Sequence, residues 1–477
     1  MKRILIFAGV IALFTSCYKE FQGVNMDSSG LEYIYNEKYT DYGENPFVKV
    51  SEEPLSTFAI DADGGAYSNM RRFANLGQKP PVASVRIEEY INYFNFDYPY
   101  PTEDKVGISS ESCICPWNED HLLVRIGLKG AELNNRPPSN FVLLMDVSGS
   151  MNSPDKLGIL KSGFKSFVDQ ISENDRIAIV TYAGSAQVLL QSTSGSETSA
   201  IKRAIGKLGA GGSTAGAQGI ITAYEIAEEN FISGGNNRII LGSDGDFNVG
   251  PSSTDELVEL IEDKRDKGIF LTVLGVGGGN LNDGMMEQIA NNGNGNYEYI
   301  DNAEQMEKVF IHEYDKFFTI AKDTKIQINF NPASVDSYRL IGYENRVLEN
   351  EEFEVDSTDA GEIGAGQTIT ALYEIITTDI TEDILANLDL RYKNPSESSS
   401  LLISHQIQLT ATPFNQSSEN QRFAASVVGL GLLLKESEYK GELTFKEVKN
   451  WAESAVSFDP FGFREEFVDL VDDLSKY

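Results

Sequence analysis

The chain has 477 residues, too many for one typical hydrophobic core, so about two to four domains of ~150 residues are expected. Its 39 basic and 72 acidic side chains give a formal net charge of −33. That charge would repel a phosphate backbone and excludes nucleic acid as an expected partner. A hydrophobic fraction of 41% with 10% aromatic residues is ordinary for globular proteins and excludes wholesale disorder.

The first residues resemble a bacterial lipoprotein signal. A short basic region is followed by the apolar residues 4–14, too few to cross a bilayer, and then by small residues and Cys17. The resemblance implies that residues 1–16 are a signal peptide and that the Cys17 thiol carries lipid. Acyl chains contribute ~0.8 kcal/mol per buried CH₂, so they would anchor the chain to a membrane without a spanning helix.

Residues 17–50 are rich in Gly, Asn, Ser and Asp and are predicted to form a flexible tether. Directly after Cys17, Lys19 and Glu20 resemble the short lysine-plus-acid signals that export some bacterial lipoproteins to the outer face of the outer membrane. The expected location is therefore the bacterial cell envelope. There the chain would be lipid-anchored at the outer membrane, on its periplasmic or its surface-exposed face.

An N-terminal region at residues 51–137 combines helices with one β-hairpin. Helical patterns occupy residues 66–77 and 83–96, and period-two alternation marks residues 107–130 as the hairpin. A lone hairpin needs a partner sheet, so we expect it to join the strands that follow residue 320. Cys113 and Cys115, only two residues apart, are predicted to be small core residues without a disulfide.

Residues 138–318 alternate short apolar strands with helices, which predicts a doubly wound, mainly parallel sheet covered by helices on both faces. The predicted strands are residues 141–146, 176–183, 186–191, 238–245, 269–277 and 295–300. Ligands of such folds bind at the carboxyl ends of the strands, where the strand order reverses. Asp146 ends the first strand of the set.

Period-two alternation returns in residues 319–415 and predicts an antiparallel β-sandwich. The α/β domain would then be inserted in this sandwich. Residues 416–477 are predicted to be a helical accessory region that packs on the early helices. The expected fold class is thus α/β, with the doubly wound domain inserted in a β-sandwich beside a helical region.

Hard oxygen ligands gather at the predicted strand ends of the α/β domain. Asp146, Ser148 and Ser150 form a D-x-S-x-S turn directly after the first strand. Thr214 lies in a glycine loop before a helix, and Asp244 ends the fourth strand. Carboxylate and hydroxyl oxygens suit Mg²⁺ or Ca²⁺ better than zinc. Because these strand ends meet at one edge of the sheet, the sequence predicts a divalent-metal site there.

This set of residues is similar to the metal-ion-dependent adhesion site of the von Willebrand factor type A domain family, which has a Rossmann-like fold. The resemblance implies that Ser148, Ser150 and Thr214 bind Mg²⁺, Ca²⁺ or Mn²⁺ directly. Asp146 and Asp244 would act mainly through bound water. One coordination position would stay open for an Asp or Glu carboxylate of a protein partner.

Further segments resemble a bacterial lipoprotein family that carries this domain between family-specific N- and C-terminal regions. The resemblance covers roughly residues 52–475 and rests on residues 54–73, 85–94, 340–346, 359–375 and 459–471. With the predicted lipid anchor and metal site, the sequence predicts a membrane-anchored, metal-dependent protein-binding module without catalysis, used in adhesion or envelope assembly. A structural envelope protein with an unused metal site is one alternative.

A metal-assisted phosphatase is the other alternative, because the D-x-D-G segment at Asp61 and Asp63 resembles the nucleophile motif of haloacid-dehalogenase-type phosphatases. That family also needs a hydroxyl residue where this chain has Gly65, and an EF-hand loop starting at Asp61 lacks its glycine and its bidentate acid. Asp61 and Asp63 are instead predicted to cap the following helix or to pair with Arg71 or Arg72. The three histidines form no zinc-hydrolase or serine-histidine pattern.

Overall fold

The computed structural model describes residues 37–212, 216–245, 254–379 and 382–477. The predicted signal peptide, Cys17, the tether as far as residue 36, and Thr214 lie outside the described residues. Within the described ranges, no helix combines the length and the apolar character needed to cross a membrane.

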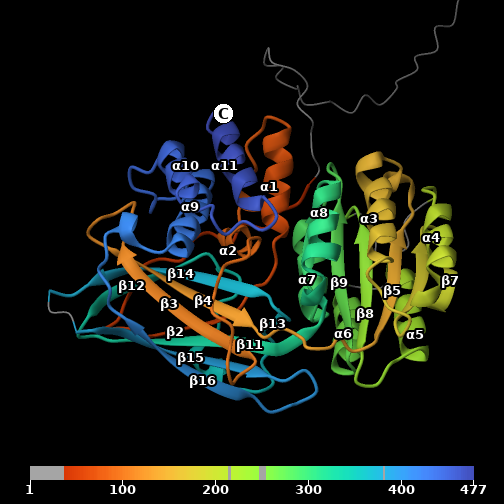
Figure 1. Cartoon of the computed structure of the whole chain (residues 1–477), viewed down its shortest axis with the longest axis horizontal. Coiled ribbons are helices and arrows are strands. Elements are labelled where there is room, and N and C mark those ends of the chain that lie inside the picture. Colours follow the sequence, from red (N-terminus) through yellow and green to blue (C-terminus); the bar gives the residue numbers. More distant parts are fainter. Residues whose placement is uncertain (1–36, 213–215, 246–253, 380–381) are drawn as a thin grey trace, which may run out of the picture. The chain divides into compact units, whose positions relative to one another are not determined.

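The α/β domain is built on a six-stranded sheet with the order β10-β9-β8-β5-β6-β7 (Figure 1). All neighbouring strands are parallel except the β6–β7 hairpin. The strands are β5 (Ser139–Asp146), β6 (Arg176–Tyr182), β7 (Ala186–Ser194), β8 (Asn236–Ser243), β9 (Ile269–Val276) and β10 (Tyr297–Ile300). The doubly wound, mainly parallel sheet predicted from the sequence is confirmed.

Helices cover both faces of this sheet because alternate residues of the buried strand β5 face opposite sides. Leu143 and Met145 share a hydrophobic cluster with α3, α4 and α8, whereas Val142 and Leu144 share another with α5, α6 and α7. The helices are α3 (Ile159–Phe167), α4 (Thr198–Lys207), α5 (Gly216–Glu229), α6 (Thr254–Asp266), α7 (Asp283–Asn292) and α8 (Ala303–Glu307). A strand buried on both faces explains the continuous apolar run that precedes Asp146.

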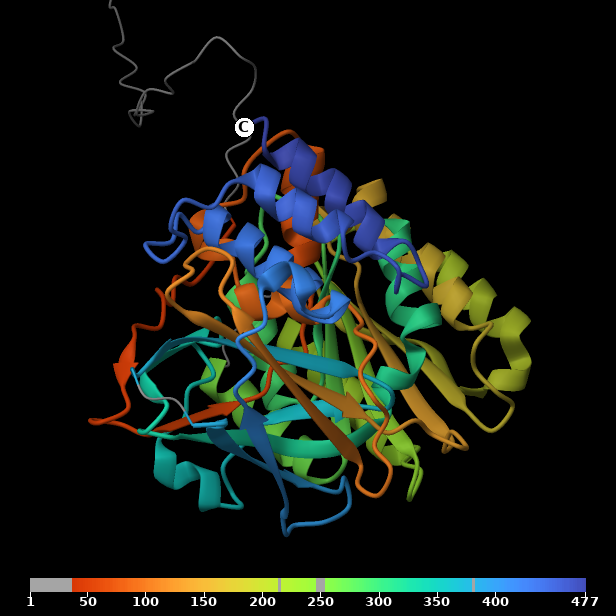
Figure 2. The same cartoon turned by 60° about the vertical axis from the view of Figure 1, so that its left-hand side comes forward.

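Two antiparallel sheets form the β-sandwich (Figure 2). One has the order β1-β12-β14-β4-β3 and the other the order β13-β11-β15-β16, with β2 also paired to β11. The strands are β1 (Val48–Lys49), β2 (Leu55–Ala59), β3 (Val106–Ile114), β4 (Leu122–Gly130), β11 (Thr319–Phe330), β12 (Val335–Ile341), β13 (Gly361–Gly364), β14 (Thr368–Thr377), β15 (Ile384–Lys393) and β16 (Leu401–Gln408). The β3–β4 hairpin pairs with β14, as expected, so the α/β domain is inserted between β4 and β11.

The early and late helices share one hydrophobic core, which also includes Leu123 of β4 and Leu372 of β14. These helices are α1 (Gly65–Asn75), α2 (Ile87–Asn92), α9 (Glu419–Leu434), α10 (Phe445–Glu453) and α11 (Phe463–Leu474). The C-terminal helices therefore pack on the early ones, as the sequence predicts. Cys113 and Cys115 are buried and free.

Residues 37–50 are folded, although the predicted tether extends to residue 50. The Glu37 carboxylate accepts a hydrogen bond of 2.8 Å from the Arg72 guanidinium, and the Lys38 N–H donates to the Leu281 carbonyl at 2.9 Å. Strand β1 then adds to the edge of a sandwich sheet by pairing with β12. Polar composition alone predicts a tether here, but these long-range bonds hold the segment in place.

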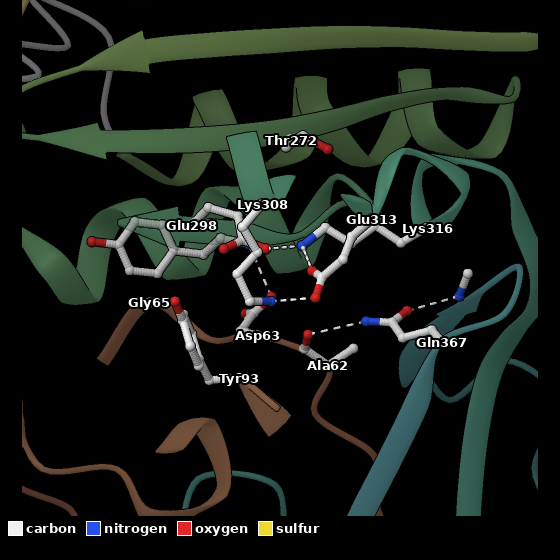
Figure 3. A network of polar contacts seen from close by, with 12 residues as sticks. Ala62, Asp63, Gly65, Tyr93, Thr272, Glu298, Lys308, Glu313, Lys316 and Gln367 are labelled. Atoms are coloured by element: carbon white, nitrogen blue, oxygen red, sulfur yellow. Dashed lines mark hydrogen bonds and ion pairs between the residues drawn. The ribbon is translucent and has the colours of Figure 1, made fainter. Parts of the chain in front are cut away.

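A buried polar network joins the end of the α/β domain to the other parts (Figure 3). The Lys316 ammonium contacts the carboxylates of Glu298 and Glu313, and Lys308 also contacts Glu313. Although burial acts to raise the pKa of Glu313, Lys308 and Lys316 hold it at about 2. Close by, the Gln367 side chain donates to the Ala62 carbonyl at 3.2 Å. The Tyr297 N–H of β10 donates to Asp63 Oδ1 at 2.9 Å, and this bond fixes the loop after β2 against the α/β domain.

Candidate metal centre

The candidate centre lies where β5 and β8, two neighbouring parallel strands, end at the same edge of the sheet. Strand β5 lies between β6, which follows it in the chain, and β8 on its other side. The strand order therefore reverses at β5, and the carboxyl ends of β5 and β8 mark the reversal point. Asp146 is the last residue of β5, and Asp244 directly follows Ser243, the last residue of β8. All three side chains are fully buried.

The turn after β5 directs two hydroxyls toward one point. The backbone N–H of Ser148 donates to Asp146 Oδ1 at 2.8 Å, and the Oγ atoms of Ser148 and Ser150 lie 2.9 Å apart. Ser148 is buried, whereas Ser150 is exposed. The N–H of Gly149 donates to the Gly212 carbonyl at 3.0 Å, which holds the chain that leads to Thr214 beside the turn.

The β8 side of the centre is bonded to Asp146. Ser243 Oγ donates to Asp146 Oδ2 at 3.2 Å and accepts from the Gly245 N–H, also at 3.2 Å. Gly245 has φ +87°, and a Cβ there would lie 2.5 Å from the backbone nitrogen of Asn282. Only glycine fits this turn without strain. The structure thus brings together four of the five predicted site residues: Asp146, Ser148, Ser150 and Asp244.

The electrostatics of the centre favour a cation. Burial raises the pKa of Asp146, the negative charge of Asp244 raises it further, and hydrogen bonds from Ser148 and Ser243 lower it. The residues also fit a metal by their chemistry, since they offer only hard oxygen atoms. Adjacent ligands on octahedral Mg²⁺ lie about 2.9 Å apart, which is the separation of the two serine hydroxyls, 2.9 Å.

Lys156 is a member of the centre that the sequence prediction missed. Its ammonium donates to Asp244 Oδ2 at 2.8 Å and to Asn280 Oδ1 at 3.1 Å, and its side chain is only 10% exposed. Gly277 makes room for this lysine, because a Cβ at Gly277 would lie 2.4 Å from Lys156 Cε. A lysine at the start of an amphipathic helix normally faces solvent, so no sequence pattern indicates this ion pair.

Lys156→Met is expected to destabilise the metal-free chain by about 3 kcal/mol, because it removes the ammonium partner of a buried carboxylate. The same change leaves the centre more negative, so Mg²⁺ is expected to bind more tightly. Thermal unfolding in chelator and a Mg²⁺ titration measure the two effects. Lys165→Met, an exposed position in α3, is the matched control. Unchanged stability and unchanged Mg²⁺ affinity would contradict the assigned role.

The alternative phosphatase site at Asp61 and Asp63 is buried, with both residues 2% exposed. Asp61 Oδ2 lies 2.8 Å from Arg346 Nη2, and Asp63 Oδ1 accepts from the Tyr297 N–H at 2.9 Å. An aspartate nucleophile must reach a phosphoryl group, and a buried carboxylate that faces an arginine gives that mechanism no support.

The predicted local partners of these two aspartates are wrong. Gly64 is the N-cap residue of α1, and the side chain that bonds the first turn of this helix is Glu89, whose carboxylate accepts from the Ala66 N–H at 2.7 Å. Arg71 pairs with Asp301 of the α/β domain at 2.6 Å, and Arg72 pairs with Glu37. Long-range partners outcompete the neighbouring ones because the loop after β2 is enclosed by other parts of the chain.

Three family models match the chain. The von Willebrand factor type A domain matches residues 140–311, and a model described as von Willebrand factor matches residues 33–125. A model described as uncharacterized protein YfbK, C-terminal, matches residues 315–476. The α/β domain that carries the candidate centre is therefore a von Willebrand factor type A domain.

One relative extends this likeness beyond the domain. A protein of Escherichia coli K12 described as uncharacterized protein YfbK is 40% identical over 466 residues, which cover 91% of this chain and 80% of that protein. Protein sll0103 of Synechocystis is 22% identical over 306 residues, covering 62% and 71% of the two chains. A solved von Willebrand factor type A structure from Catenulispora acidiphila has 17% identity and a TM-score of 0.43, covering 79% and 91%. The chain belongs to the YfbK family, whose members carry a von Willebrand factor type A domain between family-specific N- and C-terminal regions.

Proposed function

We propose that this chain is a protein-binding module that depends on a divalent cation in its von Willebrand factor type A domain. Ser148, Ser150 and Thr214 bind Mg²⁺ or Ca²⁺ directly, and Asp146 and Asp244 act through bound water. An Asp or Glu carboxylate of a protein partner takes the remaining coordination position. The observation that carries the proposal is the convergence of the D-x-S-x-S turn and Asp244 at the strand-reversal edge.

The donor chemistry supports capture of an acidic group. Neutral serine and threonine hydroxyls leave most of the charge of a bound cation uncompensated, so an incoming carboxylate gains a strong charge-assisted contact. The exposure of Ser150 beside the buried Asp146 supports an open side of the centre that faces the surface. The formal net charge of −33 disfavours acidic partners elsewhere on the surface, so the cation also selects the point of contact.

Partner capture tests this function. Envelope extracts are passed over the immobilised chain with Mg²⁺ or with chelator, and the bound proteins are identified by mass spectrometry. The same protein is expected to bind the wild-type chain in Mg²⁺ and to be lost in chelator and with Asp146→Ala. A partner that binds equally in all three conditions would instead favour a structural envelope role in which the metal centre is unused.

We also propose that the chain is lipid-anchored through Cys17 in the bacterial cell envelope, at the outer membrane on its periplasmic or its surface-exposed face. The support is the lipoprotein-like order of basic, apolar and small residues before Cys17. Cys17→Ser is expected to move the chain from the membrane fraction to the soluble fraction and to abolish labelling by a fatty-acid analogue. A membrane-bound and labelled Cys17→Ser chain would refute the anchor.

A further inference from the structure

Five buried carboxylates from separate parts of the chain surround two arginines, away from the candidate metal centre. They come from the loop after β2, from α2, and from α7 of the von Willebrand factor type A domain: Asp61, Asp63, Glu89, Asp283 and Glu287. Each of these side chains is at most 3% exposed. We call this set the acidic cluster.

Arg346 and Arg86 contact the acidic cluster from two sides. Arg346 Nη2 lies 2.8 Å from Asp61 Oδ2, 3.7 Å from Glu287 Oε1 and 3.9 Å from Asp63 Oδ2. Arg86 Nη1 lies 2.5 Å from an Asp283 oxygen and 3.3 Å from Glu287 Oε2. The Nε of Arg86 donates to Glu89. The carboxylates therefore share these guanidinium groups instead of forming separate pairs.

The charges of the acidic cluster do not balance. Five carboxylates share two guanidinium groups, so the set would carry a net charge of −3 with every carboxylate ionised. An uncompensated charge is costly in a buried site, and either protons or a further cation must neutralise it. Burial and the nearby charge of Asp61 raise the pKa of Asp63 well above its usual range. Burial likewise raises the pKa of Glu287.

One oxygen atom of the acidic cluster stands apart from the donors. Asp63 Oδ2 is buried and accepts no hydrogen bond from any residue that the structure describes, and its nearest cationic nitrogen, Arg346 Nη2, is 3.9 Å away. Buried carboxylate oxygens without a donor are rare and indicate a missing ligand or solvent contact. Asp63 Oδ2 faces the same Arg346 nitrogen as Asp61 and Glu287 do, so it is directed into the cluster.

The spacing of the oxygens fits calcium. One carboxylate oxygen each from Asp61, Glu89 and Glu287 lie within 4.8 Å of one another. Ligands on opposite sides of Ca²⁺ lie about 4.6–5.2 Å apart, whereas those on opposite sides of Mg²⁺ lie only about 4.2 Å apart. Oxygens no more than 4.8 Å apart can therefore share one Ca²⁺ after small side-chain shifts. Because the acidic cluster offers oxygen ligands only, it suits Ca²⁺ better than zinc or copper.

We propose that Asp61, Glu89 and Glu287 bind a calcium ion, with Asp63 Oδ2 as a further ligand. The ion joins the loop after β2 and helix α2 to helix α7, and so fastens the von Willebrand factor type A domain to the N-terminal region. This site is separate from the candidate metal centre and does not depend on the proposed partner binding. No local motif could reveal it, since its ligands are separated by up to 226 residues in the sequence.

Calcium stoichiometry in the full mature chain tests the proposal. Asp146→Ala removes the candidate metal centre, so equilibrium dialysis and calorimetry with Ca²⁺ on this variant report on the acidic cluster. One Ca²⁺ per chain is expected with Asp146→Ala, and none after Glu287→Gln is added. Tb³⁺ serves as a second probe, because Tyr297, whose hydroxyl donates to Asp283 at 2.9 Å, can sensitise its luminescence. No Ca²⁺ bound to the Asp146→Ala chain would overturn the proposal.

Thermal unfolding separates calcium binding from a purely structural role of Glu287. In chelator, Glu287→Gln removes one of the uncompensated charges, so the double variant is expected to melt at or above the temperature of Asp146→Ala. With Ca²⁺, only the Asp146→Ala chain is expected to gain stability. Equal losses with and without Ca²⁺ would show that Glu287 serves only as an arginine partner and would overturn the proposal. Glu374→Gln, at a buried glutamate paired with Arg339, is the control that should keep its Ca²⁺.

Discussion

Asp146→Asn is expected to abolish the stabilisation that Mg²⁺ gives to the wild-type chain. A cation at 100 times its Kd stabilises a folded domain by about 2.7 kcal/mol, which raises the Tm of a domain of this size by about 5–10 °C. The asparagine keeps an oxygen to accept from the Ser148 N–H but removes the carboxylate charge that the cation needs. Differential scanning calorimetry in Mg²⁺ and in chelator measures the change.

The metal-free chain should tolerate this substitution. Burial and Asp244 raise the pKa of Asp146 above that of the unfolded chain, so the charged form of Asp146 disfavours folding at neutral pH. That penalty vanishes as the pH falls below the unfolded pKa, and Asp146→Asn removes it at every pH. The expected melting temperature in chelator is therefore equal to or above that of the wild type.

A neighbouring exposed acid provides the control for this prediction. Asp155 lies in the same loop, at the surface, so Asp155→Asn should keep the full Mg²⁺ shift. An Asp146→Asn chain that still gains the wild-type Mg²⁺ shift would show that the cation binds elsewhere. Ca²⁺ is still expected to raise the melting temperature of Asp146→Asn by a smaller amount. This remaining rise should disappear when Glu287→Gln is added.

The α/β domain and its candidate centre could be predicted because their signals are local. A strand buried on both faces produces a continuous apolar run, and the turn that follows it holds Asp146, Ser148 and Ser150 within five residues. Strand-helix alternation then predicts that Asp244 reaches the same edge. The hairpin at residues 107–130 was also predictable, because an unpaired sheet edge must find a partner.

Contacts that depend on tertiary enclosure could not be predicted. Asp61 pairs with Arg346, which lies 285 residues away, although two arginines follow it within 11 residues. Lys156 reaches Asp244 only because Gly277 leaves space for its side chain. In both cases the folded chain decides which charged residue lies next to the buried carboxylate: Arg346 beside Asp61, and Lys156 beside Asp244. Sequence spacing carries no information about that choice.

Arg71→Met is expected to destabilise the chain by about 3–5 kcal/mol in urea unfolding, because one buried guanidinium holds three parts of the chain together. Arg71 lies in α1 and is 1% exposed. Its Nε and Nη2 donate to both oxygens of Asp301, which follows β10, at 2.8 and 2.6 Å. Its Nη1 donates to Glu466 of α11 at 2.9 Å. Methionine keeps much of the volume but leaves the 2%-exposed Asp301 without this cation.

A surface pair and a double variant give this prediction its controls. Arg136 pairs with Asp315, but the two side chains are 49% and 45% exposed, so Arg136→Met should cost no more than about 1 kcal/mol. Adding Asp301→Asn to Arg71→Met removes the isolated buried charge and is expected to recover a large part of the lost stability. An Arg71→Met chain as stable as Arg136→Met would mean that hydrophobic packing alone fastens the type A domain to α1 and α11. Recovery in the double variant would instead identify the uncompensated Asp301 charge as the cause of the loss.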